Sequence, residues 1–259
     1  MVVWGPRLGA IRRSSGASVH VLKTARDRQP DQTAARSYTP NSRTRQVSAP
    51  DRHLQRRIEQ RWLRRLCTPI KLPGPWSEGF VLEGQHTLSS TLIGHDSNGN
   101  PQFDTKRSEL GELVYRLKNR SDRKALTPIA EAAVEFIKDW APKVDAIVAV
   151  PPSRKRAYQP VVEIAKAIGR LLSVPVDLAA VLKAKDTPEL KNVFDFKERT
   201  TALKGAFKAN EKAVRGKRIL LVDDLYRSGA TASIVATALI ASGATRVYML
   251  AMTKTRTRT

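Results

Sequence analysis

The chain has 259 residues, 41% of them hydrophobic, which is enough for one domain with a core and additional segments. It carries 46 Lys and Arg against 24 Asp and Glu, and this net charge of +22 favours polyanionic partners such as phosphorylated metabolites or nucleic acid. A single cysteine excludes an internal disulfide and a cysteine-rich zinc site and favours a reducing cytoplasm. No run of 18 apolar residues is present to span a membrane.

The first 79 residues divide into a leader and a connecting segment. Residues 1–52 are basic and lack apolar periodicity, so we expect a disordered leader. A nucleic-acid-binding arm is the alternative, and it is disfavoured because stacking aromatics do not alternate with the arginines. Residues 53–79 are expected to form a basic helix and a Pro-rich linker. We expect this helix to pack on the domain, although it also has the composition of a membrane-facing or nucleic-acid-facing helix.

Residues 80–125 form a separate region ahead of the regular α/β alternation. Strands are predicted at Phe80–Leu82 and Thr87–Ile93, followed by a turn at Asp96–Asn100. Ser108 is placed to cap a helix that extends to Leu117.

Residues 126–254 alternate between helical and strand patterns, which predicts an α/β fold with a mostly parallel sheet flanked by helices. Thr127 is the expected cap of the first helix in this region. The predicted elements are a helix over Pro128–Trp140, a strand over Asp145–Val150, a helix over Pro160–Leu172, an extended segment over Val176–Leu178, a strand over Ile219–Val222, a helix ending near Ser242 and a strand over Val247–Ala251. The charged interval 183–201 has no sustained period, and residues 255–259 form a basic tail.

The stretch RILLVDDLYRSGAT, residues 218–231, carries the clearest chemical signal. Asp223 and Asp224 are expected where the strand ends, at the sheet edge where open α/β sheets bind ligands. Such carboxylates accept hydrogen bonds from sugar hydroxyls or hold Mg²⁺. The segment Ser228–Thr231 offers hydroxyls and backbone N–H groups to a phosphate at the start of a helix. A carboxylate that only caps the turn would explain one acid but not an adjacent pair.

This stretch resembles the ribose-5-phosphate signature of the type I phosphoribosyltransferases, and the chain is similar to their ComF-like group. Three further stretches resemble the family in its order along the chain, namely GELVYRLKNRSD at 111–122, RKRAYQPVVEIAKAIG at 154–169 and DTPELKNVFDFKERTTALKGAF at 186–207. The resemblance covers roughly residues 80–254. It implies the type I phosphoribosyltransferase fold, with residues 80–125 as a small hood, 126–254 as the core, and a reaction with 5-phosphoribosyl 1-pyrophosphate and Mg²⁺.

The resemblance also implies a role for individual residues. Asp223 and Asp224 would contact the ribose hydroxyls and act as the catalytic pair, with no protein residues holding a metal. The remaining roles fall on the 5-phosphate loop Arg227, Ser228, Gly229, Ala230 and Thr231, on the pyrophosphate turn Ser153, Arg154 and Lys155, and on a lid that includes Lys183, Lys185 and Arg199.

Two departures from the family pattern limit these implications. Family loops commonly carry Thr-Thr-Gly where this chain has Arg227-Ser228-Gly229, so the role of the arginine is open between phosphate and solvent. The four-cysteine zinc module of ComF proteins is absent, so the hood must fold without metal. The alternative function is a non-catalytic sugar-phosphate sensor or a DNA-handling protein. The acceptor base and the oligomeric state are open, and Tyr158 is either a base-stacking or a packing residue.

Overall fold

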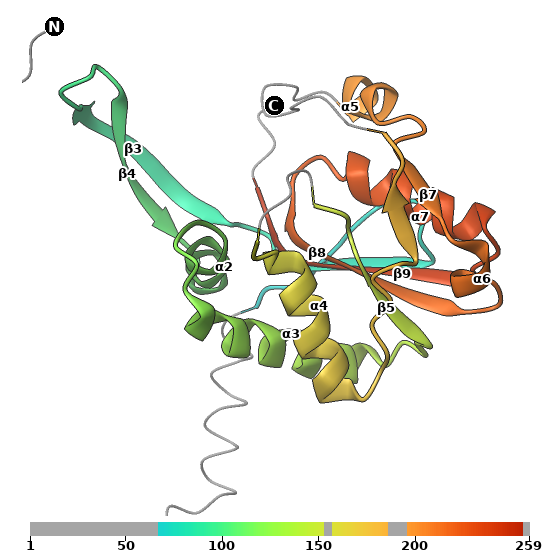
Figure 1. Ribbon diagram of the computed structural model, residues 1–259. Helices are drawn as coiled ribbons and strands as arrows, with labels where there is room; N and C mark the ends of the chain where they lie inside the picture. The colour runs from blue at the N-terminus through green and yellow to red at the C-terminus, as the bar shows by residue number, and fades with distance from the viewer. Residues whose placement is uncertain (1–66, 153–156, 186–195, 256–259) are drawn as a thin grey trace, which may run out of the picture. The chain divides into compact units, whose positions relative to one another are not determined.

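The computed structural model describes residues 67–152, 157–185 and 196–255, whose arrangement is shown in Figure 1. The predicted leader at 1–52, the basic helix within 53–66 and residues 256–259 of the tail lie outside them. The elements are β1 (Ile70–Lys71), β2 (Glu78–Glu83), β3 (Thr87–His95), β4 (Pro101–Arg107), α2 (Glu109–Asn119), η1 (Arg123–Ala125), α3 (Leu126–Trp140), β5 (Ala146–Ala149), α4 (Pro160–Leu172), β6 (Val181–Lys183), α5 (Phe196–Ala202), β7 (Phe207–Ala209), α6 (Glu211–Val214), β8 (Arg218–Tyr226), α7 (Ala230–Ala241) and β9 (Arg246–Lys254).

Five strands form the central sheet in the order β1, β2, β9, β8, β5. The last four run parallel to one another, and only β1 is antiparallel to its neighbour β2. Parallel neighbours arise because helices lead the chain back across the sheet between strands. The predicted α/β class with a mostly parallel sheet and flanking helices is therefore confirmed.

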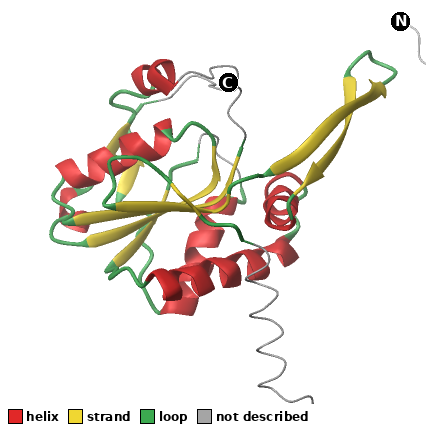
Figure 2. Cartoon of the chain, turned by 180° about the vertical axis from the view of Figure 1, so that it is seen from behind, coloured by secondary structure: helices red, strands yellow, loops and turns green. Residues whose placement is uncertain are grey.

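Helices cover both faces of this sheet (Figure 2). Side chains alternate along β8, so Leu220 and Val222 pack in one core cluster with α2, α3 and α4, whereas Ile219 and Leu221 pack in a second cluster with α7. Burial on both faces explains why β8 and β9 are continuous apolar runs rather than alternating ones. None of the helices in the described ranges is long and apolar enough to cross a membrane.

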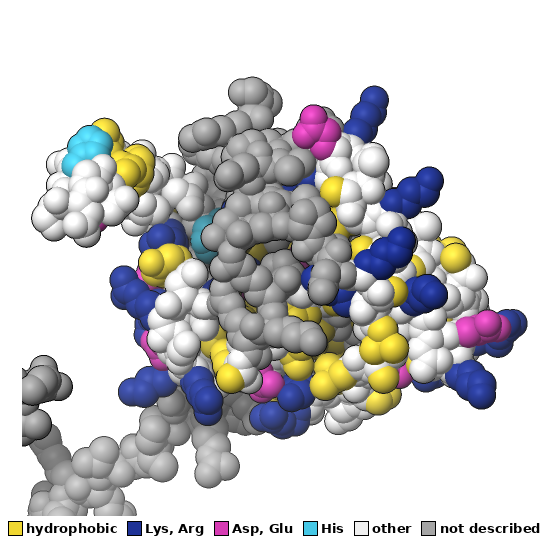
Figure 3. Space-filling model, turned by 45° about the horizontal axis from the view of Figure 1, so that its top comes forward, with side chains coloured by type: hydrophobic (Ala, Val, Ile, Leu, Met, Phe, Trp, Pro, Cys, Tyr) yellow, Lys and Arg dark blue, Asp and Glu magenta, His cyan; other side chains and the backbone are white. Residues whose placement is uncertain are grey.

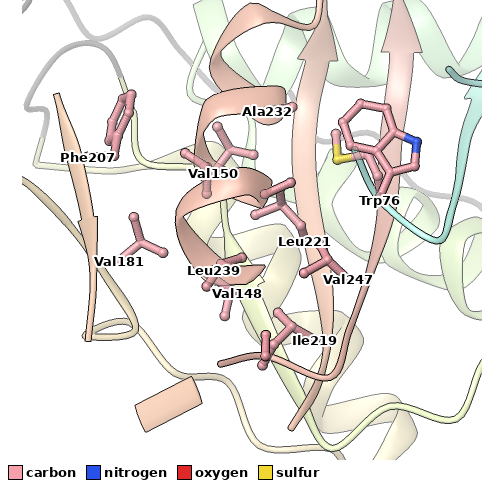
Figure 4. Packing of buried hydrophobic residues seen from close by; sticks show 14 of the residues in the cluster. Trp76, Val148, Val150, Val181, Phe207, Ile219, Leu221, Ala232, Leu239 and Val247 are labelled. Carbon is pink, nitrogen blue, oxygen red and sulfur yellow. The ribbon is translucent and has the colours of Figure 1, made fainter. Parts of the chain in front are cut away.

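The segment predicted as a Pro-rich linker contributes to the core. Ile70 and Lys71 pair with β2, and Trp76 is only 6% exposed in the cluster that contains Leu221 and Val247 (Figure 4). The Trp76 Nε1 donates to the carbonyl oxygen of Leu72 at 2.9 Å, so the indole is buried with its polar atom paired. The linker prediction is wrong for this part because a buried tryptophan outweighs the local Pro and Gly signals.

The predicted hood does not form a separate unit. Phe80–Leu82 lie in β2 of the central sheet, and α2 buries Leu110, Val114 and Leu117 in the same cluster as α3 and α4. Of the strands within 80–125, β3 and β4 lie outside the central sheet as an antiparallel hairpin. The turn of this hairpin is closed by the carboxylate of Asp96, as the Asp-Ser-Asn-Gly-Asn cluster predicts. Apolar side chains on this hairpin are open to solvent (Figure 3).

Helix starts show where local signals held and where they did not. Ser108 caps α2 as predicted, since its Oγ accepts from the Gly111 N–H at 3.1 Å. Thr127 is not a cap. The 3₁₀ turn η1 begins at Asp122, whose carboxylate accepts from the Lys124 N–H, and runs directly into α3 at Leu126. The capping chemistry therefore lies five residues earlier than predicted.

Candidate functional site

Strand β8 passes through the two acids instead of ending at them. It continues to Tyr226 because Leu225 and Tyr226 pair with Thr253 and Lys254 of β9. Neighbouring residues on a strand point to opposite faces, so Asp223 and Asp224, called here the acid pair, project to different sides of the sheet. The prediction of a strand end at Asp223 is wrong, and the two carboxylates have different surroundings as a result.

Asp224 is a buried carboxylate with a full counter-charge. Its side chain accepts two contacts from Lys118 Nζ, at 2.9 Å to Oδ1 and 2.8 Å to Oδ2, and the residue is only 7% exposed. Lys118 lies in the last turn of α2, which packs on this face of the sheet. A buried carboxylate is costly without a charged or hydrogen-bonding partner, and Lys118 supplies that partner.

A buried histidine lies beside this ion pair. The Nδ1 of His86 is 3.0 Å from Thr253 Oγ1, and that hydroxyl is 3.5 Å from the carbonyl oxygen of Asp224. Burial, together with the positive charges of Arg107 and Lys118, lowers the pKa of His86 to about 4. His86 is therefore neutral near pH 7 and connects the strand end to the start of β3.

Within the described residues Asp223 forms no ion pair of its own, and it is partly exposed. Its Oδ1 accepts from the Asp224 backbone N–H at 2.9 Å. Burial and the charge of Asp224 raise the pKa of Asp223 to about 7, although Lys118 opposes this shift. The acid pair thus consists of one carboxylate in a close ion pair with Lys118 and one that titrates near neutrality.

The segment Arg227–Thr231, called here the phosphate loop, turns the chain from β8 into α7. Gly229 has φ +78°, and a Cβ there would lie within about 2 Å of the Tyr226 hydroxyl, so only glycine fits. It occupies the N-cap position of α7 and offers no capping side chain. The first N–H groups of α7 are therefore available to an anion, apart from a long 3.4 Å contact between Ala230 N and Ser228 Oγ.

The phosphate loop itself is unevenly exposed. Arg227 is exposed, Ser228 and Thr231 are half-buried, and Gly229 and Ala230 are buried. Two hydroxyls and a guanidinium therefore lie at the start of a 12-residue helix, whose amino end carries partial positive charge.

Of the three residues predicted for pyrophosphate, Ser153, Arg154 and Lys155, none lies within the described residues. The chain that leads to them is described. Ala149 is the register partner of Val222, and the Val150 N–H donates to the Val222 carbonyl oxygen at 2.8 Å. Strand β5 therefore ends beside the acid pair, at the same edge of the sheet.

The predicted lid residues are divided among three elements. Lys183 ends β6 and Lys185 follows it, whereas residues 186–195 lie outside the described ranges. Arg199 lies in α5, which packs against α7. Burial and the charge of Arg227 lower the pKa of Arg199, so the two guanidinium groups are electrostatic neighbours. Arg199 thus adds positive charge beside the phosphate loop, while within the described ranges Lys183 contacts neither Asp223 nor Asp224.

Sequence reasoning missed Lys118, His86 and Thr253. The sequence shows a lysine at the end of the helix predicted to reach Leu117 and a threonine after the last predicted strand. It does not show that α2 packs next to β8, which is what brings Lys118 to Asp224. The structure also places Cys67 and Tyr158. Burial raises the pKa of the Cys67 thiol to about 12, so Cys67 is not an activated thiol. Tyr158 packs against the cluster around α4, and Arg123 lies 5.2 Å from its ring centroid.

A resident metal site was not expected from the sequence. Within 67–152, 157–185 and 196–255, no three His, Cys, Asp or Glu side chains come together as metal ligands. The acid pair alone could supply one or two oxygens to a Mg²⁺ that keeps several waters or phosphate oxygens.

No protein-family model matches the sequence, and no curated protein matches it. Solved structures with a similar arrangement include the B. subtilis glutamine phosphoribosylpyrophosphate amidotransferase complexed with ADP and GMP, at 18% identity and a TM-score of 0.40, covering 60% of this chain and 34% of that one. Others are Leishmania donovani UMP synthase (16%, TM-score 0.37, covering 64% and 28%) and Saccharomyces cerevisiae adenine phosphoribosyltransferase (14%, TM-score 0.38, covering 64% and 84%). The chain thus spans about a third of the first of these proteins.

Proposed function

We propose that the chain is a ComF-like phosphoribosyltransferase that binds 5-phosphoribosyl 1-pyrophosphate and transfers its phosphoribosyl group to a nitrogen base. The observation that carries the proposal is the sequence of groups along β8 and α7. Two carboxylates at one edge of a parallel sheet are followed, after four intervening residues, by a left-handed glycine at the open amino end of a helix. This order suits a sugar phosphate, whose hydroxyls and phosphate are separated by a few bonds.

In this proposal the 5-phosphate binds at the phosphate loop. Its oxygens accept hydrogen bonds from the first N–H groups of α7 and from the hydroxyls of Ser228 and Thr231. Arg227 and Arg199 supply full positive charge there, which also relieves the repulsion between their guanidinium groups. A phosphate dianion gains more from this loop than a neutral ligand does, because the helix dipole and both arginines favour negative charge.

The ribose hydroxyls then reach the acid pair. Asp224, which is paired with Lys118, acts as a hydrogen-bond acceptor. Asp223 titrates near neutrality, so it is able to accept a hydroxyl proton or carry one as the charge at C1 changes. A positive charge that develops on the sugar ring is stabilised by nearby carboxylates.

The transfer itself forms one bond and breaks another. The nitrogen of the base forms a bond to C1, and the bond between C1 and the pyrophosphate oxygen breaks, with its electron pair leaving on pyrophosphate. The turn 153–155 after β5 and the lid residues Lys183 and Lys185 are proposed to bind this leaving group, since basic side chains and N–H groups favour the charge that develops on it.

In this proposal Mg²⁺ enters the site bound to the pyrophosphate oxygens and is not held by protein side chains alone. The described residues offer two carboxylates, and Lys118 already contacts both oxygens of one of them. When bound, Mg²⁺ neutralises charge on the leaving pyrophosphate.

One observation favours a second candidate, a sensor that binds the sugar phosphate without turning it over. The Lys118–Asp224 ion pair must loosen, or be shared, before ribose hydroxyls approach Asp224. In a sensor, replacing the Lys118–Asp224 contact by contacts with ribose hydroxyls would move α2, and no acceptor base would be needed. In the DNA-handling alternative the leader would bind single-stranded DNA.

Pyrophosphate release separates these candidates. The protein is incubated with 5-phosphoribosyl 1-pyrophosphate, Mg²⁺ and a panel of nitrogen bases. Release that depends on one base is expected for the enzyme, whereas ligand-induced thermal stabilisation without release identifies the sensor. Asp223→Asn combined with Asp224→Asn should abolish both, and Asp104→Asn, an exposed acid of β4, should change neither. If stabilisation survives in the double variant, the acid pair is not the ligand site.

A further inference from the structure

A cavity lies at the opposite edge of the central sheet from the acid pair. Its volume is about 460 Å³, within the range of small-molecule sites. It is formed where β2, β8 and β9 begin and where α3 ends. The side chains that matter for its chemistry are Glu78, Trp140, Lys143, Arg218, Arg246 and Tyr248.

The lining carries more positive than negative charge. Arg218 and Arg246 are register partners at the start of the adjacent parallel strands β8 and β9, so two guanidinium-bearing residues lie side by side. Like charges on neighbouring strands repel unless an anion lies between them. Asp145 compensates the charge of only one of these arginines. Its carboxylate accepts hydrogen bonds from Arg218 Nε at 2.9 Å and Nη2 at 2.6 Å. Within the described ranges, Arg246 and Lys143 form no ion pair.

Two aromatic rings give this cavity a preformed wall. Trp140 and Tyr248 meet edge to face with centroids 5.6 Å apart, and Trp140 Nε1 donates to Glu78 Oε2 at 2.6 Å. The Glu78 carboxylate is thereby occupied, and only Tyr248 of the two rings is almost fully buried. The carbonyl end of α3 adds partial negative charge, but the full charges of Lys143, Arg218 and Arg246 outweigh it.

The cavity cannot be part of the acid-pair site. Arg218 and Asp223 are five residues apart on one strand, and at about 3.3 Å per residue this places them roughly 17 Å apart. A small phosphate cannot span that distance, so a ligand that binds here binds independently of one at the phosphate loop.

We propose that this cavity is a second anion site that binds the phosphate group of a small phosphate monoester. The phosphate oxygens would lie between Arg218, Arg246 and Lys143, and the rest of the ligand against the aromatic wall. Arginine side chains recognise phosphate through paired N–H donors, and a dianion between them removes their mutual repulsion. The inference does not depend on the transferase proposal, because none of these residues belongs to that site.

The test is calorimetric titration of the full chain with AMP, ribose 5-phosphate and inorganic phosphate. It is carried out in the Asp223→Asn, Asp224→Asn, Ser228→Ala background to weaken the phosphate loop. Saturable binding is expected to remain there, and Arg246→Gln with Lys143→Gln should weaken it about tenfold or more. Arg170→Gln, which removes an exposed charge from α4, should leave binding unchanged. AMP stronger than ribose 5-phosphate would place a base on the aromatic wall, and equal affinities would place only the phosphate in the cavity.

Three results would overturn the proposal. They are the absence of binding in that background, binding that does not change in the Arg246 and Lys143 variant, and equal weakening by Arg170→Gln. Thermal unfolding of each variant shows whether the fold is retained, and a neutral sugar such as ribose should not bind. Because the acid pair is already removed, failure here leaves the transferase test unaffected.

Discussion

The charged groups at the two ends of β8 and β9 differ in their exposure to solvent. At the carboxyl end, Asp224 and His86 are buried and Asp223 is partly exposed, and two of these groups have strongly shifted pKa values. At the amino end, Arg218 and Asp145 form a close ion pair in which both side chains are 37% exposed. The same two strands therefore carry one desolvated and one hydrated set of charges.

This contrast shows that burial, more than charge count, decides what a charged group does. At the amino end, water shares in solvating the Arg218–Asp145 pair, so its contribution to the free energy of unfolding is small. At the carboxyl end, α2 and the hairpin start exclude water, so each charge must be paired, neutralised or used. We expect the largest mutational effects where desolvation is strongest, and the following variants test that order.

Lys118→Met should have the largest effect. It leaves Asp224 buried without its counter-charge, and we expect a loss of about 2–4 kcal/mol in the free energy of unfolding, less than for a fully buried pair because Lys118 is partly exposed. Urea unfolding at pH 7.5 measures it. Lys138→Met, on an exposed position of α3, is the matched control. Adding Asp224→Asn to Lys118→Met should restore part of the loss, and a loss no larger than that of the control would contradict the buried-pair account.

Asp223→Asn should have an effect of similar size and opposite sign to that of Lys118→Met, but only at high pH. The folded-state pKa of about 7 lies above the unfolded value of 3.8, so this carboxyl contributes stability below pH 4 that is lost as pH rises through 7. The asparagine amide does not titrate, so the variant does not lose this part of the free energy of unfolding as pH rises. The variant should match the native chain near pH 4 and exceed it at pH 8 by on the order of 2–4 kcal/mol. Unfolding free energies at four pH values test this, and parallel curves for the two proteins would show that Asp223 is not perturbed.

Asp145→Asn should have the smallest effect. The hydrogen bonds and charge of Arg218 lower the pKa of Asp145 to about 2, so the pair stabilises the fold above the usual carboxyl range and loses that contribution as pH falls through 2. Both side chains are well exposed, and 1 M salt shortens the screening length to about 3 Å. The drop in melting temperature at low salt should therefore largely vanish in 1 M NaCl. A drop that is unchanged by salt would place this pair with the buried charges of the other edge.

Much of the local structure was predictable because its causes lie within a few residues. The apolar run Ile219–Val222 predicts a buried strand, Ser108 predicts its own helix start, and Asp96–Asn100 predicts a turn. In each case the hydrogen bond or the periodicity connects neighbours in the sequence. The adjacent acids and the glycine before α7 can likewise be identified in the sequence. The sugar-phosphate hypothesis follows from these residues alone.

What failed depends on partners far along the chain. Strand β8 continues beyond Asp223 and Asp224 because Tyr226 pairs with Lys254 of β9. The segment predicted as a linker is part of the core because Trp76 packs in the same cluster as Val247. No local pattern contains either contact.

The sequence by itself determined the α/β class, the position of the acid pair and the helix that follows it, because propensity and periodicity act over short stretches. Only the tertiary structure decided that Asp223 and Asp224 differ. Lys118 is 106 residues from Asp224, and His86 is 167 residues from Thr253. Their contacts therefore exist only after α2 packs onto the sheet and His86 comes beside the end of β9. Desolvation and pairing then set the pKa values, and both are properties of the packed chain.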